Sequence, residues 1–426
     1  MPPTLPLPPP PQPVERVVVG FSGGLDSTVL LHALKAAGHA VRALHVHHGL
    51  HPDAARWEAH CEALCAEWQV PFASVRVQVR RDGGEGPEAA ARRARYAAFA
   101  EHLGEGEVLA LAHHRDDQAE TFLLRALRGS GVDGLAAMRP WRPLARGAVW
   151  RPLLELSRAE LLTYAQAHGL RWIDDPSNAD VTLDRNFLRQ RVLPLLRERW
   201  PQADVPLARA AALAAEAADL LDEEDARALA AVRTADPQAL SRDALRRLPA
   251  PRRARVLRRW LAALHLPPLP AEGLARIEAE LLPARQDAEA AFAWSGAVVR
   301  AWRDLLHAEA EHAPLPARWE APWDGRLPLV LPDGGALTLE GAPALPVPLT
   351  ARARRGGERI ALPGRTHSHA LKHVLQSLGV PPWERARLPL LCDGEDRVLA
   401  VADLLYAAPF DAWLRDHGAR LRWTPP

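Results

Sequence analysis

The chain is poor in cysteine and has no long hydrophobic run. Its 426 residues include only three cysteines, Cys61, Cys65 and Cys392. So few thiols argue against a disulfide framework and indicate a reducing compartment. No stretch of about 18 apolar residues is free of charge, so we expect no transmembrane helix. The N-terminus lacks the basic and apolar segments of a signal peptide. Together these absences predict a cytoplasmic protein without a membrane partner.

Lysine is almost missing as well. Lys35 and Lys372 are the only lysines among 53 basic residues, so arginine carries nearly all of the positive charge. Arginine reads phosphates and bases well, but a GC-rich coding sequence would produce the same bias. The net charge of +1 hides any local basic face. Composition therefore neither predicts nor excludes binding to nucleic acid.

The order of elements predicts the fold class. Short β-rich runs alternate with helical stretches through residues 14–115, with strands expected at 14–21, 41–46, 74–79 and 107–112. Such alternation is typical of an α/β fold with a doubly wound parallel sheet. Ligands of such sheets bind at the carboxyl ends of the strands.

Changes in composition predict the domain boundaries. Alanine, leucine, arginine and glutamate at helical spacing indicate a helical domain after the sheet, and a small α/β module ends the chain. The prediction is a proline-rich tail, an α/β domain, a helical domain, a proline-rich linker and a C-terminal module at residues 1–13, 14–200, 201–315, 316–348 and 349–426.

The first chemical motif follows the first predicted strand. It reads SGGLDS and opens a helix. Two glycines permit a sharp turn, and successive N–H groups ahead of a helix form a nest for anions. A glycine turn with a polar cap would look similar, and the lysine of a Walker A loop is missing. The interpretation as a phosphate loop assigns nucleotide binding to Ser22, Gly23, Gly24, Leu25, Asp26 and Ser27.

The second motif, AHHRDDQAETFLLR at 112–125, lies where the fourth predicted strand passes into a helix. His113 and His114 are at the end of the strand. Asp117 and Glu120 are three residues apart and share a helix face. An acidic pair at this position can hold Mg²⁺ or an ammonium group. It can equally compensate the helix dipole, and spacing alone does not decide between the two.

Both motifs resemble those of known enzymes. SGGLDS is the signature of the PP-loop ATP pyrophosphatases, and the second motif, with RGSG at 128–131, resembles the long form of the tRNA(Ile)-lysidine synthetases. The resemblance covers about residues 14–410. It is carried further by LHVHHGL (44–50), EAAARRARYAAF (88–99), RPLLELSRAEL (151–161), WIDDPSNAD (172–180) and RNFLRQRVLPLL (185–196).

The resemblance implies a reaction. Members of that family are C–N bond-forming ligases that join L-lysine to C2 of the wobble cytidine in the CAU anticodon of tRNA(Ile). ATP first adenylates the base, and AMP and diphosphate leave. Decoding changes from AUG to AUA. The implied cofactors are ATP and Mg²⁺, with Asp26 and Asp117 as the expected Mg²⁺ ligands.

The resemblance also suggests further roles. His113, His114 and Asp116 are candidates for the base that deprotonates lysine, and the sequence does not choose among them. Glu120 is a candidate for recognising lysine. The anticodon side is expected to involve Arg185, Arg189 and Arg191, and the distal module is expected to contact tRNA through Arg354, Arg355 and Lys372. A solvated arginine-rich surface is the alternative for both sets.

Other functions would each need a different set of residues. Another PP-loop reaction, tRNA thiolation, would need a sulfur-carrying cysteine or cysteine pairs near the loop. A zinc base deaminase would need a C-x-x-C pair to accompany the H-x-E at His60, and the sequence has none. Four histidines at 45, 47, 48 and 51 suggest zinc but lack a closing ligand set. A regulatory nucleotide-binding module would need only the loop. Neither a monomer nor a homodimer is excluded.

Overall fold

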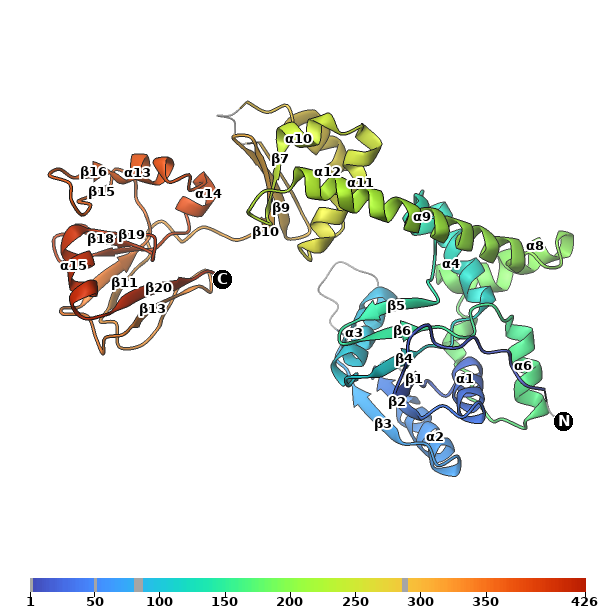
Figure 1. The fold of residues 1–426 in the computed structure, drawn as a ribbon. Helices are drawn as coiled ribbons and strands as arrows, with labels where there is room; N and C mark the ends of the chain where they lie inside the picture. The colour runs from blue at the N-terminus through green and yellow to red at the C-terminus, as the bar shows by residue number, and fades with distance from the viewer. Residues whose placement is uncertain (1–2, 50–51, 80–86, 286–289) are drawn as a thin grey trace. The chain divides into compact units, whose positions relative to one another are not determined.

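The computed structural model describes residues 3–49, 52–79, 87–285 and 290–426 (Figure 1). The chain forms two compact units, Met1–Glu223 and Glu224–Pro426. The boundary falls within the long helix α9 (Asp204–Val232). No helix in the described ranges is long and apolar enough to cross a membrane.

The first unit contains the predicted parallel sheet. Its strand order is β3-β2-β1-β4-β6-β5, where only β5 runs antiparallel to its neighbour. The predicted doubly wound α/β class is confirmed, and the hairpin of β5 and β6 was not predicted. The strands are β1 (Arg16–Gly20), β2 (Val41–His47), β3 (Phe72–Arg76), β4 (Glu107–Ala110), β5 (Trp141–Leu144) and β6 (Gly147–Trp150).

Helices cover both faces of this sheet, which is why the central strands β1 and β4 are mostly buried and apolar. Val17 and Val19 of β1 face a core that includes Leu30 of α1, whereas Val18 faces a second core with Phe99 of α3. The helices are α1 (Leu25–Ala36), α2 (Ala54–Glu67), α3 (Pro87–His102), α4 (Arg115–Leu127), α5 (Val132–Leu135) and α6 (Arg158–Ala167).

Two segments flank this sheet. The proline-rich start of the chain has no regular secondary structure from residue 3 to residue 13, yet Leu5 and Leu7 pack against the first core. Two side chains of the predicted proline-rich tail therefore pack against the core of the first unit. Beyond the sheet follow η1 (Pro176–Ala179), α7 (Asp184–Phe187), the π-helical turn η2 (Leu188–Val192) and α8 (Leu193–Arg199).

The predicted helical domain also contains a sheet. Four antiparallel strands in the order β7-β10-β9-β8 pack with the helices that follow α9. Ser295 and Gly296, both with positive φ, form the two-residue turn of a hairpin, which composition alone did not reveal. The elements are β7 (Ala239–Ser241), α10 (Arg242–Arg247), α11 (Ala250–Ala263), α12 (Ala271–Arg276), η3 (Ile277–Leu281), β8 (Ala291–Trp294), β9 (Ala297–Trp302) and β10 (Leu305–Ala310).

The predicted linker at 316–348 is wrong, because its strands belong to the C-terminal module. β11 (Glu320–Trp323) pairs with β14 (Leu349–Arg352), and β13 (Ala336–Glu340) pairs with β20 (Arg420–Thr424). Pro322 is tolerated because β11 is an edge strand. The other elements are β12 (Leu329–Val330), β15 (Arg359–Ile360), β16 (His369–Ala370), α13 (Leu371–Ser377), α14 (Pro382–Arg385), β17 (Leu390–Cys392), β18 (Val398–Val401), β19 (Leu405–Tyr406) and α15 (Ala408–Asp416).

Candidate active site

The two motifs meet at the carboxyl edge of the parallel sheet. β1 and β4 are neighbours, and the chain leaves β1 through α1 toward β2 on the opposite side. The strand order therefore reverses between β1 and β4. Such a switch point leaves a crevice where open α/β sheets bind their ligands. The loop after β1 and the start of α4 both lie at this switch point.

The loop after β1 leaves the start of α1 open. Gly24 occupies the N-cap position, and no side chain caps the helix. The first N–H groups of α1 therefore remain available to an anion, and the helix dipole adds to the attraction. The hydroxyl of Ser27 donates to the Gly24 carbonyl at 3.1 Å, so it shapes the loop. This geometry suits the predicted binding of phosphates.

Gly23 is required by the conformation of this loop. Its φ of +80° lies in the left-handed region, and a Cβ placed there would lie 2.8 Å from Cys61 Sγ and 3.0 Å from Ile173 Cδ1. Gly24 has ordinary φ, and its Cβ would meet nothing closer than 3.5 Å. A methyl group would therefore strain the backbone and crowd its neighbours at Gly23, but not at Gly24.

We expect Gly23→Ala to weaken ATP binding and to lower the melting temperature. The left-handed conformation costs about 1–2 kcal/mol for a residue with a Cβ, and the contact with buried Cys61 adds to it. Gly24→Ala is the matched control for stability and should melt like the wild type. Differential scanning calorimetry and ATP titration measure both effects. Equal melting temperatures for the two variants would contradict this account.

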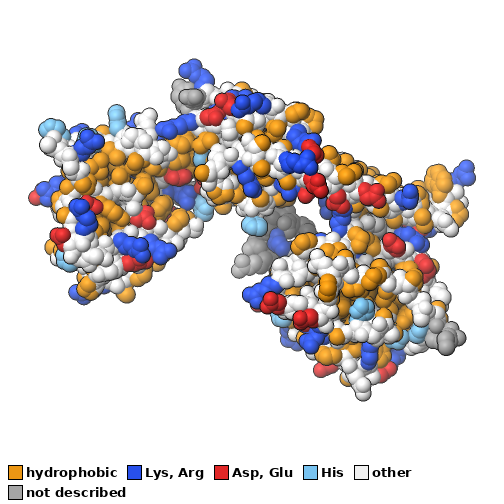
Figure 2. Space-filling model, in the orientation of Figure 1, with side chains coloured by type: hydrophobic (Ala, Val, Ile, Leu, Met, Phe, Trp, Pro, Cys, Tyr) orange, Lys and Arg blue, Asp and Glu red, His pale blue; other side chains and the backbone are white. Residues whose placement is uncertain are grey.

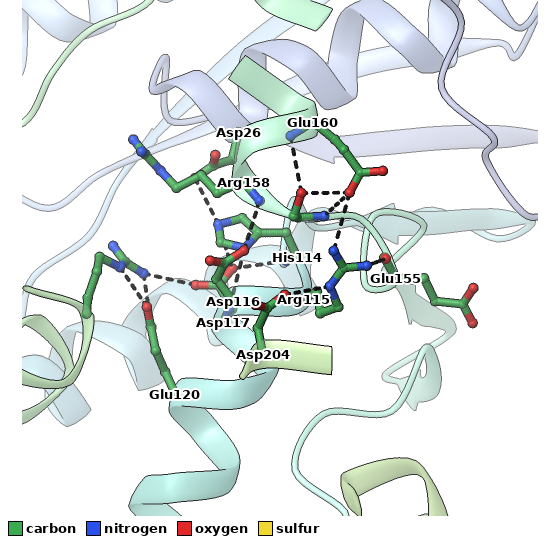
Figure 3. A network of polar contacts seen from close by, with 12 residues as sticks. Asp26, His114, Arg115, Asp116, Asp117, Glu120, Glu155, Arg158, Glu160 and Asp204 are labelled. Carbon is green, nitrogen blue, oxygen red and sulfur yellow. Dashed lines mark hydrogen bonds and ion pairs between the residues drawn. The ribbon is translucent and has the colours of Figure 1, made fainter. Parts of the chain in front are cut away.

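Three carboxylates surround His114 at the start of α4 (Figure 3). Its Nε2 lies 3.7 Å from Asp26 Oδ2 and 3.4 Å from Asp117 Oδ2, and its Nδ1 lies 3.6 Å from Asp116 Oδ2. Burial alone would lower the pKa of His114, but Asp117 and Asp26 outweigh it and the pKa is raised. His114 and Asp117 also form a capping box that begins the helix.

The predicted Mg²⁺ ligands differ in how free they are. Asp26 Oδ1 is buried and has no hydrogen-bond partner among the described residues, so this carboxylate suits a cation. Asp117 is already engaged: Oδ1 accepts from Arg185 and Arg189, and Oδ2 accepts from the His114 N–H. Mg²⁺ commonly uses one or two carboxylates together with substrate phosphates. The residues fit such an ion, with Asp26 as the better-placed ligand.

Glu120 is fully buried and paired with two arginines. Its Oε2 accepts from Arg185 Nε and its Oε1 from Arg189 Nε, both at 2.7 Å. Burial raises the pKa of Asp117 next to this group, but His114 and Arg185 outweigh it and hold the pKa far below its usual range. The four side chains therefore form a neutral cluster of two carboxylates and two guanidinium groups. Lysine could reach the Glu120 carboxylate only if an arginine moved.

The three arginines predicted to contact the anticodon side differ in their exposure. Arg185 and Arg189 point into the charge cluster, with side chains 23% and 32% exposed, so they are not a solvated helix face. Arg191, on the π-helical turn, is exposed. The extra residue of a π-turn shifts the face on which later side chains lie. Of the three arginines, only Arg191 is fully accessible to a phosphate backbone.

Asp116, a candidate base, is held by other groups. Its Oδ1 pairs with Arg197 of α8. Its Oδ2 accepts from the Arg158 N–H at the start of α6 (Figure 3). Arg197 and Arg115 in turn contact Asp204 at the start of α9. Burial raises the pKa of Asp116, but the hydrogen bond from Arg158 and the pairing with Arg197 outweigh it and lower the pKa. A carboxylate in this state is a weak base.

We expect Asp116→Asn to destabilise the protein without removing a catalytic proton acceptor. The variant loses an ion pair that joins α4 to α8. Because the pKa of Asp116 is lower in the folded than in the unfolded protein, this pair stabilises the fold above the unfolded pKa. The stabilisation is lost as the pH falls toward the folded pKa. The difference between the melting temperatures at pH 7 and pH 4 should be smaller for the variant than for the wild type. An unchanged melting temperature together with a large loss of the lysine-transfer rate would instead favour a base.

His113 contacts an arginine that sequence reasoning missed. Arg151 follows β6, is only 3% exposed and donates from Nε to His113 Nδ1 at 3.2 Å. It opens the segment RPLLELSRAEL, which was matched as a motif but given no chemical role. An arginine directly after an apolar strand at the carboxyl edge of the sheet was the available signal.

The predicted contacts of the C-terminal module are partly occupied. Arg354 lies near Glu358 and is 16% exposed, Arg355 pairs with Glu320, and Lys372 is exposed. Lys and Arg side chains are scattered among acidic ones on the face shown in Figure 2. Of the three predicted residues, Lys372 and Arg355 remain accessible to a phosphate.

The sulfur and histidine alternatives can also be compared with the structure. All three cysteines are free thiols and are buried. Burial raises the pKa of Cys61 and Cys65 to about 12 and that of Cys392 to about 11. Cys61 lies against Gly23 of the loop, but as a protonated core thiol. His45 Nδ1 contacts the Phe21 carbonyl at 2.9 Å, and His51 lies outside the described residues.

The PP-loop domain model matches residues 7–196, which include the uncapped glycine loop at the switch point of the parallel sheet. Models of the TilS substrate binding domain and the TilS substrate C-terminal domain match 240–307 and 349–423. A tRNA(Ile)-lysidine synthase of Xanthomonas axonopodis pv. citri is 57% identical over 99% of this chain and 96% of its own. One of Alkalilimnicola ehrlichii is 45% identical over 94% and 92%. The chain belongs to the tRNA(Ile)-lysidine synthase family.

Solved structures give weaker likenesses. A tRNA thiolase of Methanococcus maripaludis has a TM-score of 0.40 at 18% identity, covering 47% of this chain and 72% of its own. A crystal structure of a TILS C-terminal domain has a TM-score of 0.21 at 25% identity, covering 25% and 98%. The family assignment rests on the sequence relatives.

Proposed function

We propose that this chain ligates L-lysine to C2 of the wobble cytidine in the CAU anticodon of a tRNA(Ile). ATP is split to AMP and diphosphate through an adenylated base. One observation carries the proposal: more than half of the residues, along almost the entire chain, are identical to those of proteins named for this reaction. The free thiols also suit a reducing, cytoplasmic setting.

The geometry suggests how the chain contributes to each step. The uncapped start of α1 and the loop at Gly23 would bind the phosphates, and Asp26 would hold Mg²⁺ through Oδ1, which has no hydrogen-bond partner among the described residues. The ion would neutralise charge on the diphosphate as it leaves. The remaining protein groups supply orientation and fixed dipoles more than covalent chemistry. Asp117 acts through His114 and the two arginines that it holds.

The competing thiolation reaction has less support. It needs a nucleophilic or cluster-binding thiol, and thiolates form only when the pKa of a cysteine is low. The pKa of each cysteine here is instead raised by burial. A regulatory module that only binds a nucleotide would have no need for the substrate-binding and C-terminal domains.

Mass spectrometry of the wobble nucleoside tests the proposal directly. Purified protein is incubated with tRNA(Ile) transcript, ATP, Mg²⁺ and L-lysine, and the digest is searched for a lysine-bearing cytidine. Omitting lysine or ATP provides the controls. Incorporation of sulfur in a parallel reaction supplied with a sulfide donor would favour thiolation, and an unchanged nucleoside would reject the proposal.

The C-terminal module suggests a further prediction about tRNA. Because β11 and β13 pair with strands of this module, the removable segment is 313–426 and not 349–426. We expect the shortened chain to keep ATP binding but to bind tRNA weakly. Each lost phosphate contact should reduce the slope of log affinity against log salt by about 1. Modification of full-length tRNA should fall more than that of an anticodon stem-loop, and equal loss would contradict a tRNA-gripping role.

A further inference from the structure

Arg151 is anchored on three sides at the carboxyl edge of the sheet. Its Nη1 donates to the Arg139 carbonyl at 2.6 Å, and its Nη2 lies 3.4 Å from the Tyr96 hydroxyl. The remaining donor, Nε, points at His113 Nδ1 at 3.2 Å. With 3% of its surface exposed, the guanidinium group has no alternative partner in solvent. Its orientation relative to His113 is therefore set by the fold.

This contact decides which ring nitrogen of His113 carries the proton. A guanidinium group has only donors, so His113 Nδ1 must accept and must be unprotonated. In a neutral imidazole the proton then lies on Nε2. Protonating Nδ1 would set two N–H groups against each other beside a fixed positive charge. Burial and Arg151 both lower the pKa of His113 far below its usual range, although Asp117 acts in the opposite direction.

The free side of the ring is available to a ligand. His113 is partly exposed, and no group in the described ranges hydrogen-bonds to its Nε2. The neighbouring His114 has the opposite surroundings, because three carboxylates approach its ring. Adjacent histidines are thus separated in charge: one is kept neutral by an arginine, and the other is favoured as a cation by aspartates.

We propose that Arg151 is a positioning residue that keeps His113 neutral with its proton on Nε2, so that His113 donates a hydrogen bond to the substrate and does not accept the proton of the lysine amine. The inference rests on the proposed function for the identity of the substrate. It removes His113 from the candidate bases and gives it the role of a neutral donor at the switch point. An anionic oxygen, on a phosphate or on the reacting base, is the acceptor that such a donor would stabilise.

The tautomer can be observed without any assay of activity. The full chain is labelled with ¹⁵N-histidine, and the ring signals of His113 are identified by their loss in His113→Gln. We expect a protonated Nε2 and an unprotonated Nδ1 at neutral pH in the wild type. Arg151→Met should shift the His113 signals toward a mixture of tautomers. Arg142→Met is the control, because the Arg142 guanidinium lies over the Tyr96 ring at 4.9 Å and, among the described residues, makes no hydrogen bond to His113. It should leave those signals unchanged.

Substitutions of His113 separate a donor from a base. A glutamine amide places an N–H near the position of Nε2 but cannot accept a proton at neutral pH. We therefore expect His113→Gln to keep the rate of lysine transfer within about tenfold of the wild type. His113→Ala should lose about 10²–10³-fold in kcat, as expected for removal of one fixed donor, with little change in the KM for lysine.

The outcomes are distinct. A proton on Nδ1, an imidazolium ring in the wild type, or a His113→Gln enzyme as inactive as His113→Ala would overturn the proposal. The tautomer is read on the unmodified protein, and the signals of His113 are identified from whichever of His113→Gln and His113→Ala folds. If the wild type makes no lysine-bearing cytidine but shows the expected tautomer, the proposed function fails and the positioning by Arg151 stands.

Discussion

Replacing Asp26 with asparagine is expected to reduce ATP-dependent adenylation by about 10³-fold, which corresponds to about 4 kcal/mol of transition-state stabilisation. Asp26 belongs to the predicted phosphate loop at the start of α1, and its buried Oδ1 has no hydrogen-bond partner among the described residues. An amide keeps the shape of the side chain but loses the charge that a hard divalent cation requires. ATP–diphosphate exchange with tRNA measures the effect, and circular dichroism should show an intact fold.

The control for Asp26→Asn is Asp184→Asn. Asp184 also lies in the first turn of a helix, but its side chain is 77% exposed and its nearest basic partner, Arg128, is 3.8 Å away. This variant should keep wild-type exchange. If Asp26→Asn retained near-normal turnover at saturating Mg²⁺, the ion would have to be held by other groups.

Glu120→Gln is expected to lower stability strongly. The carboxylate is fully buried between Arg185 and Arg189, and its loss leaves two guanidinium groups without their main partner. Breaking a buried ion pair from one side costs about 3–5 kcal/mol. For a unit of this size, that corresponds to a fall in the melting temperature of roughly 10 °C. Calorimetry of the full chain measures the shift.

An exposed pair provides the comparison for Glu120→Gln. Glu67 and Arg171 are both more than half exposed, so Glu67→Gln should cost less than about 1 kcal/mol. The KM for lysine is measured on the same Glu120→Gln sample. We expect this KM to rise, because Glu120 is the carboxylate predicted to recognise the lysine amine. A higher KM with an unchanged melting temperature would mean that the carboxylate is free for lysine and not committed to the arginines.

Sequence patterns succeeded where local periodicity and spacing carry the information. The strands after residues 14, 41 and 107 and the helices between them were predicted because alternation of period two and 3.6 is visible in a single sequence. Sequence patterns failed for the predicted linker at 316–348. The prolines there suggest a break, whereas β11 is an edge strand whose partner β14 lies further along the chain. Pairing of distant segments is not encoded in local composition.

The amino-acid sequence by itself determined the class of the first domain, the glycine loop at Ser22–Ser27, the acidic helix and, through its motifs, the family. Each of these depends on residues that are neighbours in the chain. Only the tertiary structure decided which charges meet: Glu120 with Arg185 and Arg189, Asp116 with Arg197, and His113 with Arg151. These partners are separated by 38 residues or more, and the crossing of parallel strands and helices brings them together. A side chain's protonation and role depend on such partners, so motifs named the candidates and the fold distinguished among them.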